Sequence, residues 1–243
     1  MKHNVRITLV ATILHFLVDG LCACCLYMLE PFCQVVHLAA FILVYNVLAF
    51  VSQPITGIMT DILEPKDRML CGAVVCLSFA VFLTMIMSYA ESKQMLMIGF
   101  LVSAFLGVGN SLFHVWGGKR IVMQVGNEMR HLGIYVSTGA LGLSLGVLFH
   151  SRLLEFLLLS AIFFLTVICL FYVEMPDVSI DKDCQSGTTL SRIVNSYAVC
   201  LLLLIMLLVS FRSFLGNVVS STMTKNDMMI LLTGVISMFG KMS

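Results

Sequence analysis

The sequence has little charge. Only 11% of its 243 residues are aspartate, glutamate, lysine or arginine, whereas 60% are hydrophobic and the mean hydropathy is +1.03. A soluble domain carries about 25% charged and about 45–50% apolar residues. The composition therefore excludes an ordinary soluble domain and predicts an integral membrane protein, with the lipid bilayer as its first partner.

An excess of positive charge is also lacking. The formal net charge is +1, and no basic stripe runs along any segment. Nucleic-acid-binding proteins need clustered lysine and arginine to neutralise phosphates. We therefore expect no nucleic-acid partner.

Paired metal-ligand spacing is a third absence. The chain has nine cysteines and six histidines, but neither set repeats at the short intervals typical of metal sites. Cysteine inside an apolar run behaves as a small hydrophobe, and we interpret the triplet Cys22, Cys24 and Cys25 as packing. The sequence predicts no metal site and no cofactor.

The N-terminus lacks the uninterrupted apolar core of a cleaved signal peptide. Lys2 and Arg6 precede an apolar run, and Leu21-Cys22-Ala23-Cys24 superficially resembles a lipoprotein cleavage box. His15 and Asp19 interrupt that run, which continues to Met28. An uncleaved spanning helix over residues 6–28 is the better interpretation.

His15 and Asp19 are four residues apart, so a helix places them on one face. A carboxylate near mid-bilayer costs a few kcal/mol, and such residues usually face a bundle interior or a wet cavity. We expect Asp19 to face a cavity, the alternative being a partly wetted carboxylate near the membrane end. His15 is either a proton relay for Asp19 or a simple helix–helix hydrogen-bonding group.

Apolar runs of about 20 residues predict an all-α, polytopic membrane protein. The expected spans lie at residues 6–28, 35–62, 69–90, 95–116, 132–149 and 153–173, followed by a seventh at 193–219 and a partial eighth from 227. The polar residues 174–192 are expected to form a cytoplasmic linker between a six-helix bundle (1–173) and the start of a second bundle (193–243). Pro54 predicts a kink in the later half of the second span.

The basic residues predict the orientation. With the N-terminus inside, ten of the 14 lysines and arginines fall on the inner side and four on the other, at Lys93, Arg152, Arg212 and Lys225. Positive charge is enriched in cytoplasmic loops, so we expect a cytoplasmic N-terminus.

The third to sixth segments are expected to pack rather than carry ionisable chemistry. Glycines at positions 133, 139, 142 and 146 of the fifth segment recur at intervals of mostly three or four residues. Small residues in such a stripe let helix backbones approach closely. A packing seam is the favoured interpretation over a ligand site.

Between the second and third spans, Gly57 and Asp61 are followed by the bases Lys66 and Arg68. This pattern resembles the cytoplasmic loop signature of the major facilitator superfamily. Further stretches resemble the bacterial transporters related to fosmidomycin-resistance exporters. They are His15-Phe-Leu-Val-Asp19, Gln53-Pro54-Ile-Thr-Gly57, Gly109-Asn110-Ser-Leu-Phe113-His114-Val-Trp-Gly117-Gly118, Gly139-Ala-Leu-Gly142, Phe-Arg212-Ser-Phe-Leu-Gly216 and Gly240-Lys241.

The resemblance implies a six-helix major-facilitator-type half bundle plus a seventh and a partial eighth helix, in the bacterial plasma membrane. It implies secondary active transport of a small organic solute, coupled to protons, with Asp19 as protonatable group, His15 as its tuner and Arg212 as contact for an anionic group. His114 and Asn110 are the other candidates for the proton and substrate pathway. The direction stays open, because Ser137-Thr138-Gly139 lacks the glycine–proline signature of many antiporters in the superfamily.

Several alternatives remain open. His114 either lines the pathway or is solvated at the interface, and Arg212 either faces the cavity or snorkels to the outer interface. Gln53 is expected to satisfy carbonyls freed by the kink at Pro54. Because such transporters have two six-helix halves with the site between them, we expect this chain to be truncated and to lack most of a second half.

Two other function classes compete with transport. One is an inactive remnant or non-transporting membrane protein. The other is an intramembrane enzyme using His15, Asp19 and His114, which we disfavour because no nucleophile and base occur at a recognisable spacing.

Overall fold

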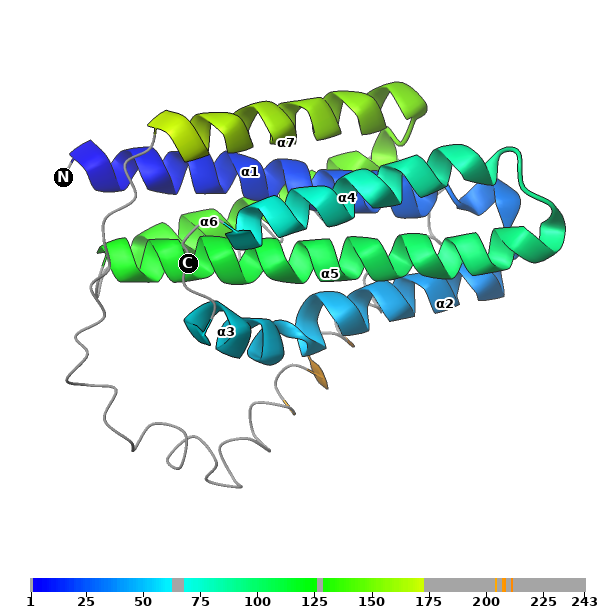
Figure 1. The fold of residues 1–243 in the computed structure, drawn as a ribbon, viewed down its shortest axis with the longest axis horizontal. Helices are drawn as coiled ribbons and strands as arrows, with labels where there is room; N and C mark the ends of the chain where they lie inside the picture. The colour runs from blue at the N-terminus through cyan, green and yellow to red at the C-terminus, as the bar shows by residue number, and fades with distance from the viewer. Residues whose placement is uncertain are drawn as a thin grey trace.

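The computed structural model describes residues 2–62, 68–125 and 129–172, with the isolated positions 204, 207, 208 and 211. The described ranges form a bundle of long helices without a strand (Figure 1). The elements are α1 (Lys2–Tyr27), η1 (Glu30–Phe32), α2 (Val35–Asn46), η2 (Val47–Val51), α3 (Gln53–Ile62), α4 (Arg68–Met87), α5 (Ser92–Val125), α6 (Met129–Leu148) and α7 (Arg152–Tyr172). The all-helical class is confirmed.

Several of these helices are long and apolar enough to cross a membrane. By length and composition the described part holds 5 such helices, or up to 6 if the bent segment from α2 to α3 counts as one span. This agrees with the expectation of an integral membrane protein. The predicted end of the fourth span at residue 116 was wrong, because α5 continues to Val125.

The second span is broken as Pro54 predicted. Its two parts, Val35–Val51 and Gln53–Met59, differ in direction by 42°, and the turns just before the break form the π-helical segment η2. The Gln53 side chain donates from Nε2 to the carbonyl oxygen of Ala49 at 3.0 Å. Gln53 therefore has the structural role expected of it, satisfying a backbone carbonyl beside the break.

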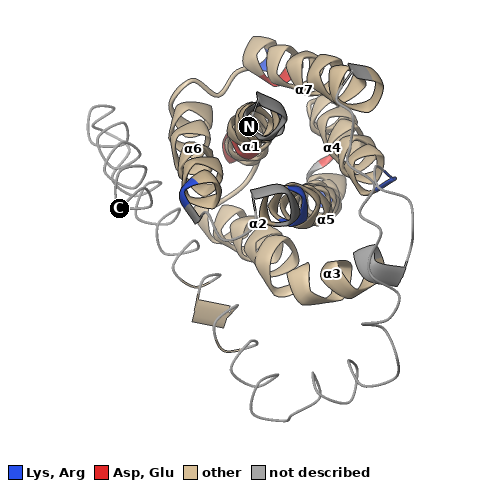
Figure 2. Cartoon of the chain, turned by 90° about the vertical axis from the view of Figure 1, so that its left-hand side faces the viewer, with Lys and Arg blue, Asp and Glu red and all other residues tan. Residues whose placement is uncertain are grey.

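Helix α1 occupies the centre of the bundle. Viewed from its N-terminal end, it is surrounded by α6, α7, α4 and α5 (Figure 2). In the 18-residue apolar stretch that marks the span Thr8–Phe32, 72% of the residues are buried inside the protein, compared with 28% in the corresponding stretch of α7. His15 and Asp19 are both buried, at 2% and 5% exposure, so their side chains face the bundle interior. That Asp19 faces a cavity stays a prediction.

The glycine stripe of α6 packs directly against α1. A Cβ atom at Gly142 would lie less than 3.0 Å from the backbone carbonyl of Phe16, and one at Gly146 would lie as close to the carbonyl of Gly20. No side chain fits between these two backbones. The predicted seam of small residues is therefore confirmed at these positions.

Some predicted features fall outside the described residues: the linker 174–192, the segments from 193 onward apart from the isolated positions, Lys66 and Arg212. The side chain of Asp61 at the end of α3 is also outside them. Of the loop motif, Gly57 lies in α3 with open space around its Cα, and Arg68 begins α4 with an exposed side chain.

Candidate functional site

Three side chains converge near the middle of the bundle: His15 and Asp19 of α1 and His114 of α5. His15 Nε2 lies 3.1 Å from Asp19 Oδ2, and His114 Nε2 lies 3.3 Å from Asp19 Oδ1. The two imidazole rings meet edge to face with their centroids 4.5 Å apart. We call these residues the His–Asp–His triad. Helical spacing predicted the first pair, and the fold adds His114 from a distant segment.

A backbone carbonyl fixes the position of one proton on His15. Its Nδ1 lies 2.6 Å from the carbonyl oxygen of Tyr135 in α6. A carbonyl only accepts hydrogen bonds, so Nδ1 carries the proton. In the neutral ring, Nε2 then presents a lone pair to the carboxylate oxygen of Asp19, and no hydrogen bond of good geometry reaches this buried atom.

Two buried acceptors that face each other repel, since neither supplies a hydrogen. The His15–Asp19 contact becomes favourable when a proton or another cation lies between the two atoms. A proton or another cation between these two atoms would therefore be stabilised in the middle of an apolar span.

Gly139 provides the space for the triad. A Cβ atom at this position of α6 would lie less than 3.0 Å from both Asp19 Oδ2 and His15 Nε2. The sequence assigned Gly139 only to the packing seam. In the fold it also borders the candidate site, so its missing side chain serves the polar cluster as well as the helix contact.

Aromatic rings enclose the triad. Phe113, Tyr135 and Phe50 lie beside the imidazoles, with the Phe50 ring centroid 6.3 Å from that of His114. The His114 side chain is 18% exposed, whereas that of His15 is 2% exposed. His15 is therefore shielded from the surface, and His114 is the most exposed member of the triad.

Asn110 lies one turn before His114 but contacts another partner. Its Nδ2 donates to the hydroxyl of Tyr45 in α2 at 2.8 Å, while its Oδ1 is buried without a hydrogen bond. The side chain extends the polar lining from the triad toward α2 rather than contacting Asp19. Gln53 and Pro54 belong to the break between α2 and α3, as described above.

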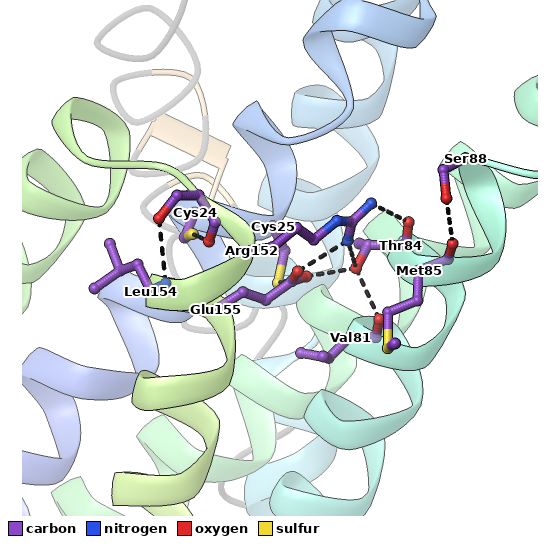
Figure 3. A network of polar contacts seen from close by, with 10 residues as sticks. Cys24, Cys25, Val81, Thr84, Met85, Ser88, Arg152, Leu154 and Glu155 are labelled. Carbon is purple, nitrogen blue, oxygen red and sulfur yellow. Dashed lines mark hydrogen bonds and ion pairs between the residues drawn. The ribbon is translucent and has the colours of Figure 1, made fainter.

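The sequence missed a second buried carboxylate, Glu155 in the first turn of α7 (Figure 3). It is fully buried and accepts from Arg152 Nη1 at 2.9 Å, from the thiol of Cys25 at 3.2 Å and from the hydroxyl of Thr84. Arg152 also donates to the backbone carbonyl of Thr84 at 2.6 Å. We call this set the Glu155 cluster.

The expectation that the third to sixth segments carry little ionisable chemistry was therefore wrong at α7. The signal was Arg152 three residues before Glu155, a spacing that pairs opposite charges on a helix. From the sequence, Arg152 was used only to predict the orientation of the chain in the membrane. The cysteine triplet is fully buried as packing predicts, although Cys25 also donates to the carboxylate.

No protein-family model matches the chain, and neither a curated protein nor a solved structure matches it.

Proposed function

We propose that this chain is a secondary transport protein of the major facilitator type, which moves a small organic solute in exchange or together with protons. Its place is the bacterial plasma membrane, with the N-terminus in the cytoplasm. The observation that carries the proposal is the His–Asp–His triad, a buried cluster of three ionisable side chains near the middle of the apolar span Thr8–Phe32. Intramembrane ionisable groups of this kind mark ion and substrate pathways.

The geometry supports a simple proton site. A proton between His15 Nε2 and Asp19 Oδ2 removes the repulsion of two facing acceptors. Because His114 binds the other carboxylate oxygen from α5, the charge on Asp19 affects the contact between α1 and α5. Loading and release of the proton would thereby change how strongly these two helices hold together.

The solute contact is the less defined part of the proposal. His114 and Asn110 lie one turn apart on one face of α5; the His114 side chain is 18% exposed, whereas Asn110 is buried and donates to Tyr45. Arg212, which the resemblance assigns to an anionic group, completes the proposed pathway. Small organic anions are the substrate class that this combination favours.

The test is transport by purified protein in lipid vesicles that contain a pH-sensitive dye. A panel of small organic anions is added outside, and a solute-dependent change of the internal pH is the expected response. Asp19→Asn should abolish the response, whereas Glu91→Gln, which removes a carboxylate from the turn between α4 and α5, should leave it intact. An unchanged response in Asp19→Asn would refute the role of Asp19.

A vesicle assay without any response from the unchanged protein would favour the competing interpretation, a non-transporting membrane protein. The panel should therefore be repeated with radiolabelled solutes, which report movement that is not coupled to protons. Solute movement without a pH change would keep transport and remove the coupling.

A further inference from the structure

The three side chains of the triad also have the chemistry of a metal site. One ligand atom from each of His15, Asp19 and His114 lies within 4.8 Å of the other two. We propose that these residues bind a divalent first-row transition-metal ion such as Zn²⁺, through the two imidazole Nε2 atoms and a carboxylate oxygen. The proposal is separate from transport, because an ion can bind here whether or not a solute is moved.

The observed separations suit a common coordination sphere. Bonds of about 2.0–2.1 Å to nitrogen and oxygen in a tetrahedral arrangement place neighbouring ligand atoms about 3.4 Å apart. His15 Nε2 lies 3.1 Å from Asp19 Oδ2, and His114 Nε2 lies 3.3 Å from the other oxygen, Oδ1. One ligand atom from each residue lies within 4.8 Å of the other two, so binding one ion requires the side chains to move closer together than they lie here.

His15 is already oriented as a metal ligand. Metal-binding histidines typically donate the other ring N–H to a carbonyl or carboxylate, which fixes the tautomer and the ring plane. The Tyr135 carbonyl provides this partner at 2.6 Å. The remaining nitrogen, Nε2, is buried, has no hydrogen bond of good geometry, and points into the triad.

The donor set selects the class of ion. Two imidazoles and one carboxylate suit Zn²⁺, Co²⁺, Ni²⁺, Mn²⁺ or Fe²⁺, whereas Ca²⁺ and Mg²⁺ prefer sites built from oxygen. Three protein ligands also leave at least one coordination position open, as in sites that exchange a ligand rather than closed structural sites. The 18% exposed side chain of His114 is the side from which the ion and its fourth ligand would enter.

The alternative is a triad held only by hydrogen bonds, with His114 donating to Asp19. That arrangement satisfies one oxygen of Asp19, and the contact of the other oxygen with His15 Nε2 then requires an additional proton between them. A metal ion resolves both contacts at once, because the lone pairs of both rings and of the carboxylate then point at positive charge.

Cobalt binding tests the proposal directly, since Co²⁺ bound by nitrogen and oxygen ligands absorbs visible light. Metal-free protein in detergent is titrated with CoCl₂, and Zn²⁺ is added afterwards to displace the cobalt. We expect one Co²⁺ per chain, displaced by one equivalent of Zn²⁺. His114→Gln and Asp19→Asn each remove a ligand and should weaken binding by more than about tenfold, the loss that changing a second-shell partner already causes.

His150→Gln is the matched control, because this histidine lies beyond the end of α6, where its ring contacts the carbonyl of Val147 and the ring of Tyr27. It should bind Co²⁺ like the unchanged protein. Equal losses in His150→Gln and His114→Gln, or absence of stoichiometric Co²⁺, would overturn the site. Thermal unfolding of each variant shows whether the fold is retained. His114→Gln is the variant expected to disturb the fold least, because His114 is the most exposed of the three ligands.

The outcome is independent of the transport assay. Stoichiometric Co²⁺ in a protein that moves no solute supports the metal site and removes the transport proposal. Proton-coupled transport without Co²⁺ binding supports the transport proposal and removes the metal site.

Discussion

The protein buries two carboxylates, and they are held in different ways. Asp19 lies near the middle of its span between two imidazoles, whereas Glu155 lies in the first turn of α7 beside a guanidinium. Arginine keeps its charge at all relevant pH values and donates in a fixed geometry, while histidine exists in neutral and charged forms. Glu155 therefore always faces a positive charge, whereas Asp19 faces one only when a neighbouring histidine is protonated.

The two sites also differ in hydrogen-bond supply. Glu155 receives hydrogen bonds from the side chains of Arg152, Cys25 and Thr84, which come from three helices (Figure 3). Asp19 faces Nε2 of His15, whereas the other ring nitrogen, Nδ1, donates its proton to the Tyr135 carbonyl. A fully supplied carboxylate stabilises the fold, and an under-supplied one is available to bind something. Stability should therefore depend on Glu155, and activity on Asp19.

The largest effect is expected for Arg152→Ala. Removing one partner of a buried ion pair leaves an uncompensated charge and costs about 3 kcal/mol of folding free energy. Glu155 has no exposed surface, although Arg152 is partly exposed. Thermal unfolding of the purified protein measures the loss. Arg68→Ala, which removes an exposed base from the start of α4, should change little, and equal stability of the two variants would contradict the structural role of the pair.

The next largest effect is expected for Gly142→Ala. A methyl group here meets the Phe16 backbone, which cannot rotate away, and overpacking of this kind costs about 1–3 kcal/mol. The separation of α1 from α6 should also disturb the His–Asp–His triad, because Tyr135 and Gly139 are on α6. Gly118→Ala is the control, since no atom lies within 4 Å of its added carbon. The contacts of Glu155 with Arg152 and Thr84 join α7 to α4 and should be retained in both variants.

Local sequence signals predicted much of the fold. Apolar runs located the helices α1 and α4 to α7, Pro54 located the break, and the stripe at positions 139, 142 and 146 located the seam with α1. These features depend on composition and spacing within one segment. The arrangement of the helices around α1 depends on packing between segments, which no single run encodes.

In the triad, too, the contact within one helix was predictable and the contact between helices was not. The interval between His15 and Asp19 is local, and it correctly predicted a shared, buried face. His114 is 95 residues from Asp19, so metal-ligand spacing along the sequence could not find the three together. Glu155 was missed because an apolar run around one acid resembles a packing helix, and its partners Thr84 and Cys25 come from distant helices.

Asp19→Asn sharpens the comparison of the two carboxylates. The new amide can donate to His15 Nε2 and still accept from His114, so both facing atoms become satisfied. We expect Asp19→Asn to be as stable as the unchanged protein or more stable by about 1 kcal/mol, because one hydrogen bond contributes about that amount. Glu155→Gln should be clearly destabilised in the same unfolding measurement, because Arg152 loses its counter-ion. A larger loss for Asp19→Asn than for Glu155→Gln would reverse the assignment of roles.

The smallest effect is expected for Cys25→Ser, which probes the weakest donor to Glu155. The thiol hydrogen bond to the carboxylate, 3.2 Å long, is replaced by that of a hydroxyl of similar size. A hydroxyl donates more strongly than a thiol but is costlier to bury. The two terms oppose each other, so the unfolding free energy should change by less than about 0.5 kcal/mol, whereas Cys25→Ala, which removes the donor, should cost about 1 kcal/mol. If both substitutions are neutral, the contacts with Arg152 of α7 and Thr84 of α4 are sufficient to stabilise Glu155, and the contact with Cys25 of α1 contributes nothing measurable.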